Sequence, residues 1–181
     1  MKTKIYSFLT KPYAVVLTML IAPLFGFIDR NFVFFFGLGV AFLILWGSNL
    51  KWSMFGIGKK ITKKTVIKSL IITLFIFIGF NIIIDPILVH YFGDFDLSSL
   101  DDIRGDLVGY IVIMIVMWVF AAFGEEFLFR GYYMKALAKL LGDNEKSWLL
   151  SAIIISIYFG VSHAYQGVIG VVSVFLWSFC I

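Results

Sequence analysis

Two adjacent glutamates and an arginine interrupt a strongly apolar segment, AAFGEEFLFRGYY at residues 121–133. Acidic side chains inside a membrane commonly cost a few kcal/mol each, so they are rare there and usually face a polar interior. On an α-helix Glu126 and Arg130 share a face, whereas Glu125 is rotated by about 100° and has no such partner. This spacing predicts that Glu126 and Arg130 support each other and that Glu125 is a general base.

A purely structural interpretation of these three residues stays open. The three residues could simply mark the cytoplasmic end of a spanning helix, where headgroups and water reach the glutamates. Arg130 would then extend its long side chain to the interface and have no chemical role.

A second polar island, YFGVSHAYQG at residues 158–167, presents His163 beside Ser162 and close to Gln166. A single histidine at the end of a helix is often only a hydrogen-bonded structural residue. A carboxylate and an imidazole at one level on neighbouring helices can instead bind and polarise one water molecule. Whether His163 has a catalytic or a structural role therefore depends on whether it lies at the same level along the helix axes as the glutamates.

The expected helices set that height. If residues 107–141 and 148–163 form an antiparallel hairpin around the turn LGDNEK, then Glu126 and His163 lie level, roughly 28 Å from the turn. The first helix would be about 52 Å long, which exceeds a bilayer core of about 30 Å. We therefore expect either a break near Gly131 or a wet cavity lined by the lysines that follow it, Lys135 and Lys139.

The composition predicts an integral membrane protein. The 181 residues are 61% hydrophobic and only 14% charged, which is more apolar than a soluble domain of this size needs. Windows of about 20 apolar residues predict about six spanning helices and one all-α, polytopic membrane domain over residues 1–181. These windows are 13–28, 32–50, 66–91, 107–124, 148–164 and 167–181.

The charges predict an orientation. The net charge is +4, but the lysines lie between apolar spans, where the positive-inside rule accounts for them better than nucleic-acid binding does. Residues 51–68 contain six lysines and no acid, whereas residues 92–106 contain five aspartates and one arginine. We expect the first loop and the amino terminus to be cytoplasmic and the second loop to be outside, in a multi-pass protein of the cell membrane.

Cysteine usage excludes a disulfide framework within one chain. Cys180 is the single cysteine, so neither a disulfide nor a thiolate metal cluster can form within the chain. We expect its thiol to be buried and inert.

The two polar islands together resemble the CAAX protease and bacteriocin-processing family. EEFLFR at 125–130 has the form Glu-Glu-x-x-x-Arg, and FGVSH at 159–163 has the form Phe-x-x-x-His. The resemblance covers about residues 107–170 and implies an all-helical intramembrane endopeptidase that cleaves a peptide bond with activated water. The implied residues are catalytic Glu125, Glu126 and His163, with Glu125 as base, and supporting Arg130 and Phe159.

The family pattern continues with a helix that carries His-x-x-x-Asn or His-x-x-x-Asp, and none follows His163. We therefore expect a chain truncated at its carboxyl end. Donors aimed at a developing oxyanion often contribute about 10²–10³ in rate each. The resemblance therefore predicts an enzyme but leaves the activity of this short chain open.

Metal dependence is also an alternative, because glutamate and histidine bind zinc. The segment lacks the two histidines, four residues apart, of a helical zinc-protease site. We expect a metal-free mechanism without a cofactor.

Three functions are compatible with the sequence. The first is an endopeptidase for small or lipidated peptides in the bilayer. The second is a non-catalytic bacteriocin-immunity or membrane scaffold protein that uses the same fold. The third, a proton-coupled transporter, would explain buried acids, but the sequence lacks repeated halves with paired broken helices.

Overall fold

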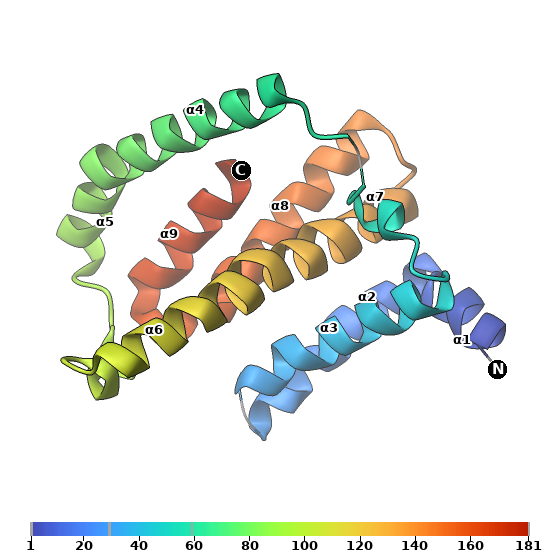
Figure 1. Cartoon of the computed structure of the whole chain (residues 1–181), viewed down its shortest axis with the longest axis horizontal. Coiled ribbons are helices and arrows are strands. Elements are labelled where there is room, and N and C mark those ends of the chain that lie inside the picture. Colours follow the sequence, from blue (N-terminus) through green and yellow to red (C-terminus); the bar gives the residue numbers. More distant parts are fainter. Residues whose placement is uncertain (1, 29, 59, 181) are drawn as a thin grey trace. The chain divides into compact units, whose positions relative to one another are not determined.

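The computed structural model describes residues 2–28, 30–58 and 60–180, and every regular element in these ranges is a helix (Figure 1). The prediction of an all-α fold is confirmed. In chain order the elements are α1 (Lys2–Leu9), α2 (Pro12–Ile21), η1 (Ala22–Phe27), α3 (Arg30–Gly47), η2 (Trp52–Phe55), α4 (Lys63–Gly79), η3 (Phe80–Ile84), α5 (Asp85–Phe92), η4 (Ser98–Ile103), α6 (Leu107–Val116), η5 (Met117–Met134), α7 (Lys135–Leu140), α8 (Glu145–Ser162), η6 (Ala164–Gln166) and α9 (Gly167–Cys180).

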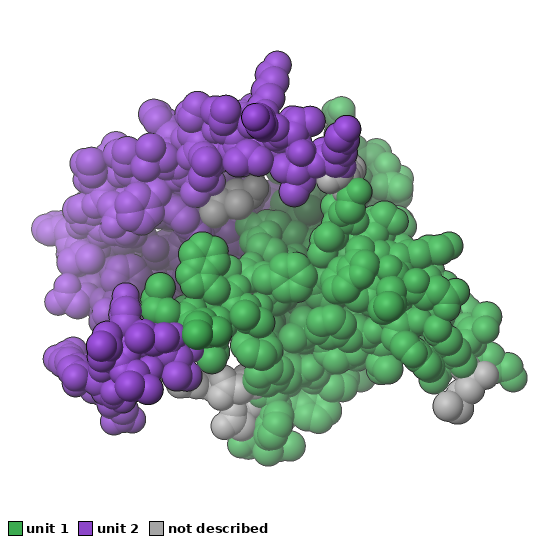
Figure 2. Space-filling view, in the orientation of Figure 1, with its two compact units in different colours: residues 1–59, 113–152 green, residues 60–112, 153–181 purple. Residues whose placement is uncertain are grey.

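The chain folds into two compact units (Figure 2). Unit 1 comprises residues 1–59 and 113–152, and unit 2 comprises residues 60–112 and 153–181. The boundary between the units falls inside α6 and inside α8, so each of these helices contributes to both. That the two units form one membrane domain stays a prediction.

The helices are apolar enough for a membrane protein. Two helices, Lys63–Phe92 and Leu107–Leu140, are each long and apolar enough to cross a bilayer. Two further pairs of helices are each bent at a short break, and each pair adds one span if its two helices cross the bilayer together. These pairs are Lys2–Leu9 with Pro12–Phe25 and Glu145–Ser162 with Ala164–Cys180. Phe32–Gly47 is a shorter apolar helix. A count of about six spans stays a prediction, whereas the polytopic membrane class is confirmed.

Unit 1 has its core where α2, α3, η5 and α7 meet. Its most buried side chains include Val15, Leu45, Leu128 and Tyr133, each 1% exposed. Gly37 allows α3 to approach η5 closely, because a Cβ there would collide with the Tyr133 hydroxyl and lie 3.1 Å from Leu128 Cδ2. Close approach of the helix backbones through glycine is a common means of packing helices in membranes.

A short, well-bonded turn separates α7 from α8 in unit 1. Gly142 and Asp143 both have positive φ, 111° and 53°, as expected just after a helix end. The Asp143 N–H donates to Ala138 O at 2.9 Å, and Ser147 Oγ donates to Leu141 O at 2.8 Å. The turn lies where the LGDNEK segment predicted it.

The helix before this turn is continuous from Leu107 to Leu140. Its middle part, η5, is π-helical over 18 residues, so backbone bonds there span five residues instead of four. The helix does not break near Gly131, and the first of our two expectations for its excess length is wrong. The predicted height of the glutamates assumed an α-helical rise throughout, and the π-helical winding removes the basis of that arithmetic.

Unit 2 is organised around α9, which runs antiparallel to α5. The Phe80 and Trp177 rings meet edge-on with centroids 4.8 Å apart, and Ser173 Oγ donates to Asp85 Oδ1 at 3.3 Å. Later residues on one helix therefore face earlier residues on the other. The Asp85 N–H donates to Phe80 O, five residues earlier, so the chain makes a π-turn just before Pro86.

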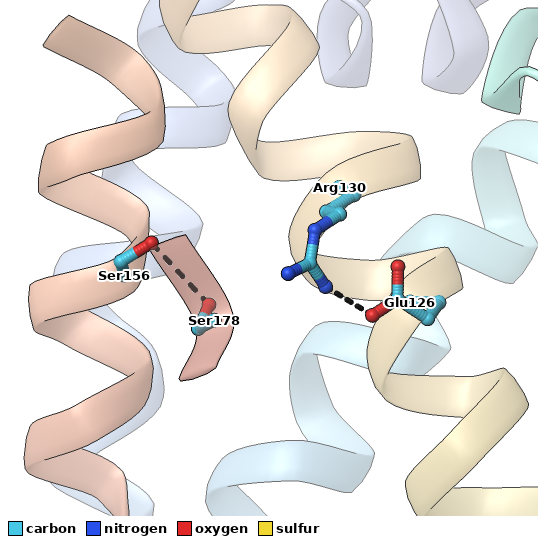
Figure 3. A network of polar contacts seen from close by, with 4 residues as sticks. All are labelled: Glu126, Arg130, Ser156 and Ser178. Carbon is cyan, nitrogen blue, oxygen red and sulfur yellow. Dashed lines mark hydrogen bonds and ion pairs between the residues drawn. The ribbon is translucent and has the colours of Figure 1, made fainter. Parts of the chain in front are cut away.

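Helix α9 also runs antiparallel to the second half of α8. Ser178 Oγ donates to Ser156 Oγ at 3.3 Å in the buried contact (Figure 3). A Cβ at Gly160 would lie 2.7 Å from Val171 O and 2.9 Å from Phe175 Cβ, so only glycine allows this contact. Cys180 at the end of α9 is exposed, and our expectation of a buried thiol is wrong, because α9 presents its last turn outward after Ser178.

Candidate active site

The acidic half of the predicted site lies on η5 in unit 1. Arg130 Nη1 donates to Glu126 Oε1, as the four-residue spacing predicted (Figure 3). The Arg130 side chain is 23% exposed and that of Glu126 is 52% exposed, while Glu125 is half-buried. This contact balances the negative charge of Glu126 with the positive charge of Arg130. Glu125 is the acid in this pair that is not used by Arg130.

Aromatic side chains hold the helix next to the glutamates. Phe127 is 2% exposed, and its ring stacks on Phe55 of η2 with centroids 4.4 Å apart. Phe42 lies 5.3 Å from the same ring, and Trp52 and Phe123 each lie 6.0 Å from it. A ring contacted from several directions has little rotational freedom. The backbone that carries Glu125 and Glu126 is therefore fixed by the adjacent residue.

The short helix η2 also contacts η5 and α7 through main-chain atoms. Lys135 Nζ donates to Met54 O at 3.3 Å, and a Cβ at Gly131 would lie 3.2 Å from Phe55 O. Lys135 thus binds a helix end in unit 1, which is the favourable place for a cation because backbone carbonyls are unsatisfied there. The second expectation, that Lys135 and Lys139 line a wet cavity, is not tested.

The histidine half of the site lies in unit 2, at the bend between α8 and η6. His163 Nδ1 lies 2.9 Å from Phe159 O and 3.2 Å from Ser162 Oγ. The Ser162 hydroxyl donates to the same Phe159 carbonyl at 2.6 Å. The Phe159 ring packs edge-on against the imidazole with centroids 4.7 Å apart. Phe159 therefore fixes His163 twice, through its carbonyl and through its ring.

The bend that carries His163 is joined to the acidic loop. The Asp96 N–H donates to Gln166 O at 3.3 Å. Hydrogen bonds from the Ser98 side chain and from its backbone N–H, 3.0 Å from Asp96 Oδ1, hold the pKa of Asp96 below its ordinary value. The negative charge of the loop thus lies beside the bend, a feature that the sequence pattern did not indicate because it depends on a tertiary contact.

Each half of the predicted site is formed locally, and the halves belong to different units. Unit 1 joins Glu126 to Arg130, and unit 2 joins His163 to Phe159. A water shared by Glu125 and His163 therefore stays a prediction.

A further His-x-x-x-Asp spacing is present, ahead of both motifs, at His90 and Asp94. α5 ends at Phe92, and Gly93 has a positive φ of 81°. His90 and Asp94 consequently do not share a helical face, and this spacing does not supply the helix that the family pattern places after His163.

These helices define the class: an all-α, polytopic membrane protein with a glutamate pair on one long helix and a histidine at a helix bend. Residues 107–181 match the model of the type II CAAX prenyl endopeptidase Rce1-like family. The predicted family resemblance is thereby confirmed for the segment that carries both motifs. The chain matches no curated protein and no solved structure.

Proposed function

We propose that this protein is an intramembrane endopeptidase that hydrolyses a peptide bond in a small or lipidated peptide. The observation that carries the proposal is that EEFLFR and FGVSH both lie within the segment that matches the family of prenyl endopeptidases. The proposed catalytic residues are Glu125, Glu126 and His163, with Arg130 and Phe159 as supporting residues.

In the proposed mechanism one water lies between Glu125 and His163. The Glu125 carboxylate accepts one hydrogen of the water, and Nε2 of His163 accepts the other, which turns an oxygen lone pair toward the substrate carbonyl. As the new C–O bond forms, the water proton passes to Glu125. The same proton then moves to the departing nitrogen as the C–N bond breaks, which restores the carboxylate.

Glu126 and Arg130 support this chemistry electrostatically. Two ionised carboxylates side by side would repel each other, and a proton taken up by either would be shared between them. Because Arg130 donates to Glu126, the second charge is balanced and Glu125 is left as the acceptor. The mechanism uses neither metal nor cofactor.

Cleavage of a defined peptide tests the proposal. The purified chain in liposomes is incubated with a farnesylated peptide ending in a cysteine, two aliphatic residues and a variable residue, and with the same peptide lacking the lipid. We expect release of the terminal tripeptide, strongly slowed release by Glu125→Gln or His163→Ala, and unchanged release by Glu145→Gln, an exposed acid outside the site. Chelators should have no effect.

The same experiment decides the alternative. If the wild-type chain binds the peptide in a pull-down but cleaves neither form, the non-catalytic immunity or scaffold function replaces the enzyme. If Glu145→Gln is as inactive as Glu125→Gln, loss of activity reflects damage to the fold and the assignment of Glu125 fails.

A further inference from the structure

One face of α4 in unit 2 forms a shallow depression that this helix alone lines and that is open on its other sides, with lysines near its start and isoleucines along the rest. The groove has a volume of about 500 Å³. We call it the α4 groove, and its lining residues are Lys64, Ile67, Lys68, Ile71 and Ile72. Their spacing of three and four residues places them on one face of the helix (α4 in Figure 1).

The positive charge of the α4 groove has no counterpart in the chain around it. No acidic residue occurs between Asp29 and Asp85, and neither Lys64 nor Lys68 forms an ion pair with any described residue. The two ammonium groups lie one helical turn apart, where like charges destabilise a helix by a few tenths of a kcal/mol. An anion between them would remove this repulsion.

The apolar part of the groove continues in the direction expected for a lipid. The span Lys63–Phe92 begins at the lysines and is long and apolar enough to cross a bilayer, which places the lysines at headgroup depth. From Lys64 to Ile72 the helix rises by about 12 Å. Ile67 and Ile71 are 57% and 62% exposed, so they offer free surface for an acyl chain directly below the charge.

We infer that the α4 groove binds an anionic phospholipid, its phosphate held by the two lysines and one acyl chain lying along the isoleucines. Charge complementarity selects the headgroup, because a zwitterionic lipid brings its own cation to the same place. The groove is independent of the proposed catalytic residues, which lie on other helices.

Lipid titration followed by native mass spectrometry tests this inference. The purified chain is titrated with dioleoyl phosphatidylglycerol and, separately, with dioleoyl phosphatidylcholine. We expect preferential retention of phosphatidylglycerol by the wild type. Lys64→Gln with Lys68→Gln should weaken that binding roughly 30-fold, because each lysine near an anionic lipid contributes a factor of about five, and should leave phosphatidylcholine binding unchanged.

A matched control separates the groove from general interfacial charge. Lys60→Gln with Lys63→Gln removes the same charge from the same end of α4 without touching the groove lining, and it should retain the preference. Lys64→Arg with Lys68→Arg keeps both charges and should also retain the preference, and unchanged phosphatidylcholine binding by the Lys64→Gln with Lys68→Gln variant shows that its loss is not caused by misfolding.

Three results would overturn the inference. The first is equal loss in the two glutamine variants, which would indicate diffuse attraction. The second is the absence of any preference in the wild type. The third is complete displacement of phosphatidylglycerol by soluble glycerol phosphate at equal concentration, which would indicate a site for free phosphate in which the isoleucines do not take part.

Discussion

Nδ1 of His163 lies 2.9 Å from the carbonyl oxygen of Phe159, four residues earlier in the chain. A carbonyl oxygen only accepts hydrogen bonds, so Nδ1 carries the hydrogen and donates it. In the neutral imidazole Nε2 is then an acceptor. This tautomer presents an acceptor to a water molecule, which is what the proposed mechanism requires of His163.

The tautomer can be measured directly, because the chain has two histidines. In a His90→Asn background, ¹⁵N-labelled histidine reports His163 alone. We expect the neutral ring to show a protonated Nδ1 and an unprotonated Nε2. A protonated Nε2 in the neutral form would show that the Phe159 carbonyl does not bind the ring and would remove the acceptor from the mechanism.

Packing of α3 on η5 predicts a difference between two glycines on the same helix. Gly37→Ala places a methyl group against the Tyr133 hydroxyl and Leu128, whereas Gly39 has nothing within 4 Å of the corresponding position. We expect Gly37→Ala to destabilise unit 1 by about 1–3 kcal/mol. Gly39→Ala should be neutral or stabilising by up to about 1 kcal/mol. Thermal unfolding in detergent measures both, and equal stability would mean that α3 and η5 do not pack as described.

The loop charges predict an orientation that labelling can test. In a Cys180→Ser background, Ser53→Cys and Asp102→Cys each introduce one thiol at an exposed position. We expect an impermeant maleimide to label Asp102→Cys in intact cells and Ser53→Cys after permeabilisation only. The reverse pattern would place the amino terminus outside.

The contact between Arg130 and Glu126 predicts unequal effects of charge changes at the two glutamates. Glu126→Lys removes the acceptor of Arg130 and adds a like charge, while Glu125→Gln preserves shape and leaves the pair intact. Because Glu126 is half-exposed and solvent screens the pair, we expect an additional loss of roughly 1 kcal/mol for Glu126→Lys, less than the about 1.5–3 kcal/mol of a well-buried hydrogen bond to a charged group. Glu126→Gln, which keeps an acceptor, should fall between the two. Indistinguishable melting curves would show that the ion pair contributes nothing.

Local sequence patterns predicted much of this structure. The apolar windows correspond to helices because an apolar helix satisfies its own backbone groups wherever it lies in a membrane. The partnership of Glu126 with Arg130 followed from their spacing, and the turn before Glu145 followed from its Gly-Asp-Asn composition.

Contacts between distant segments could not be predicted in the same way. In the π-helix Met117–Met134 each backbone hydrogen bond spans five residues instead of four. The apolar pattern of the sequence does not distinguish this winding from an α-helix. The stacking of Phe55 on Phe127 joins residues 72 positions apart, and one sequence contains no signal for such a pair. The predicted level of the glutamates along the helix axis assumed an α-helical rise, so the π-helical winding also removes the basis of that prediction.

Non-additivity of mutations is the sharpest test of a water shared by Glu125 and His163. Under the proposed mechanism, either Glu125→Gln or His163→Ala removes the activated water, so the double variant should cleave scarcely more slowly than either single variant. Expression and peptide binding should stay near wild type, because both changes remove a catalytic group and leave the fold intact. Single-turnover rates of the four proteins on the farnesylated peptide provide the measurement. If the double variant loses the product of the two single losses, Glu125 and His163 act independently and the shared water is wrong. If the single variants retain full activity, the proposed catalytic roles of both residues are wrong as well.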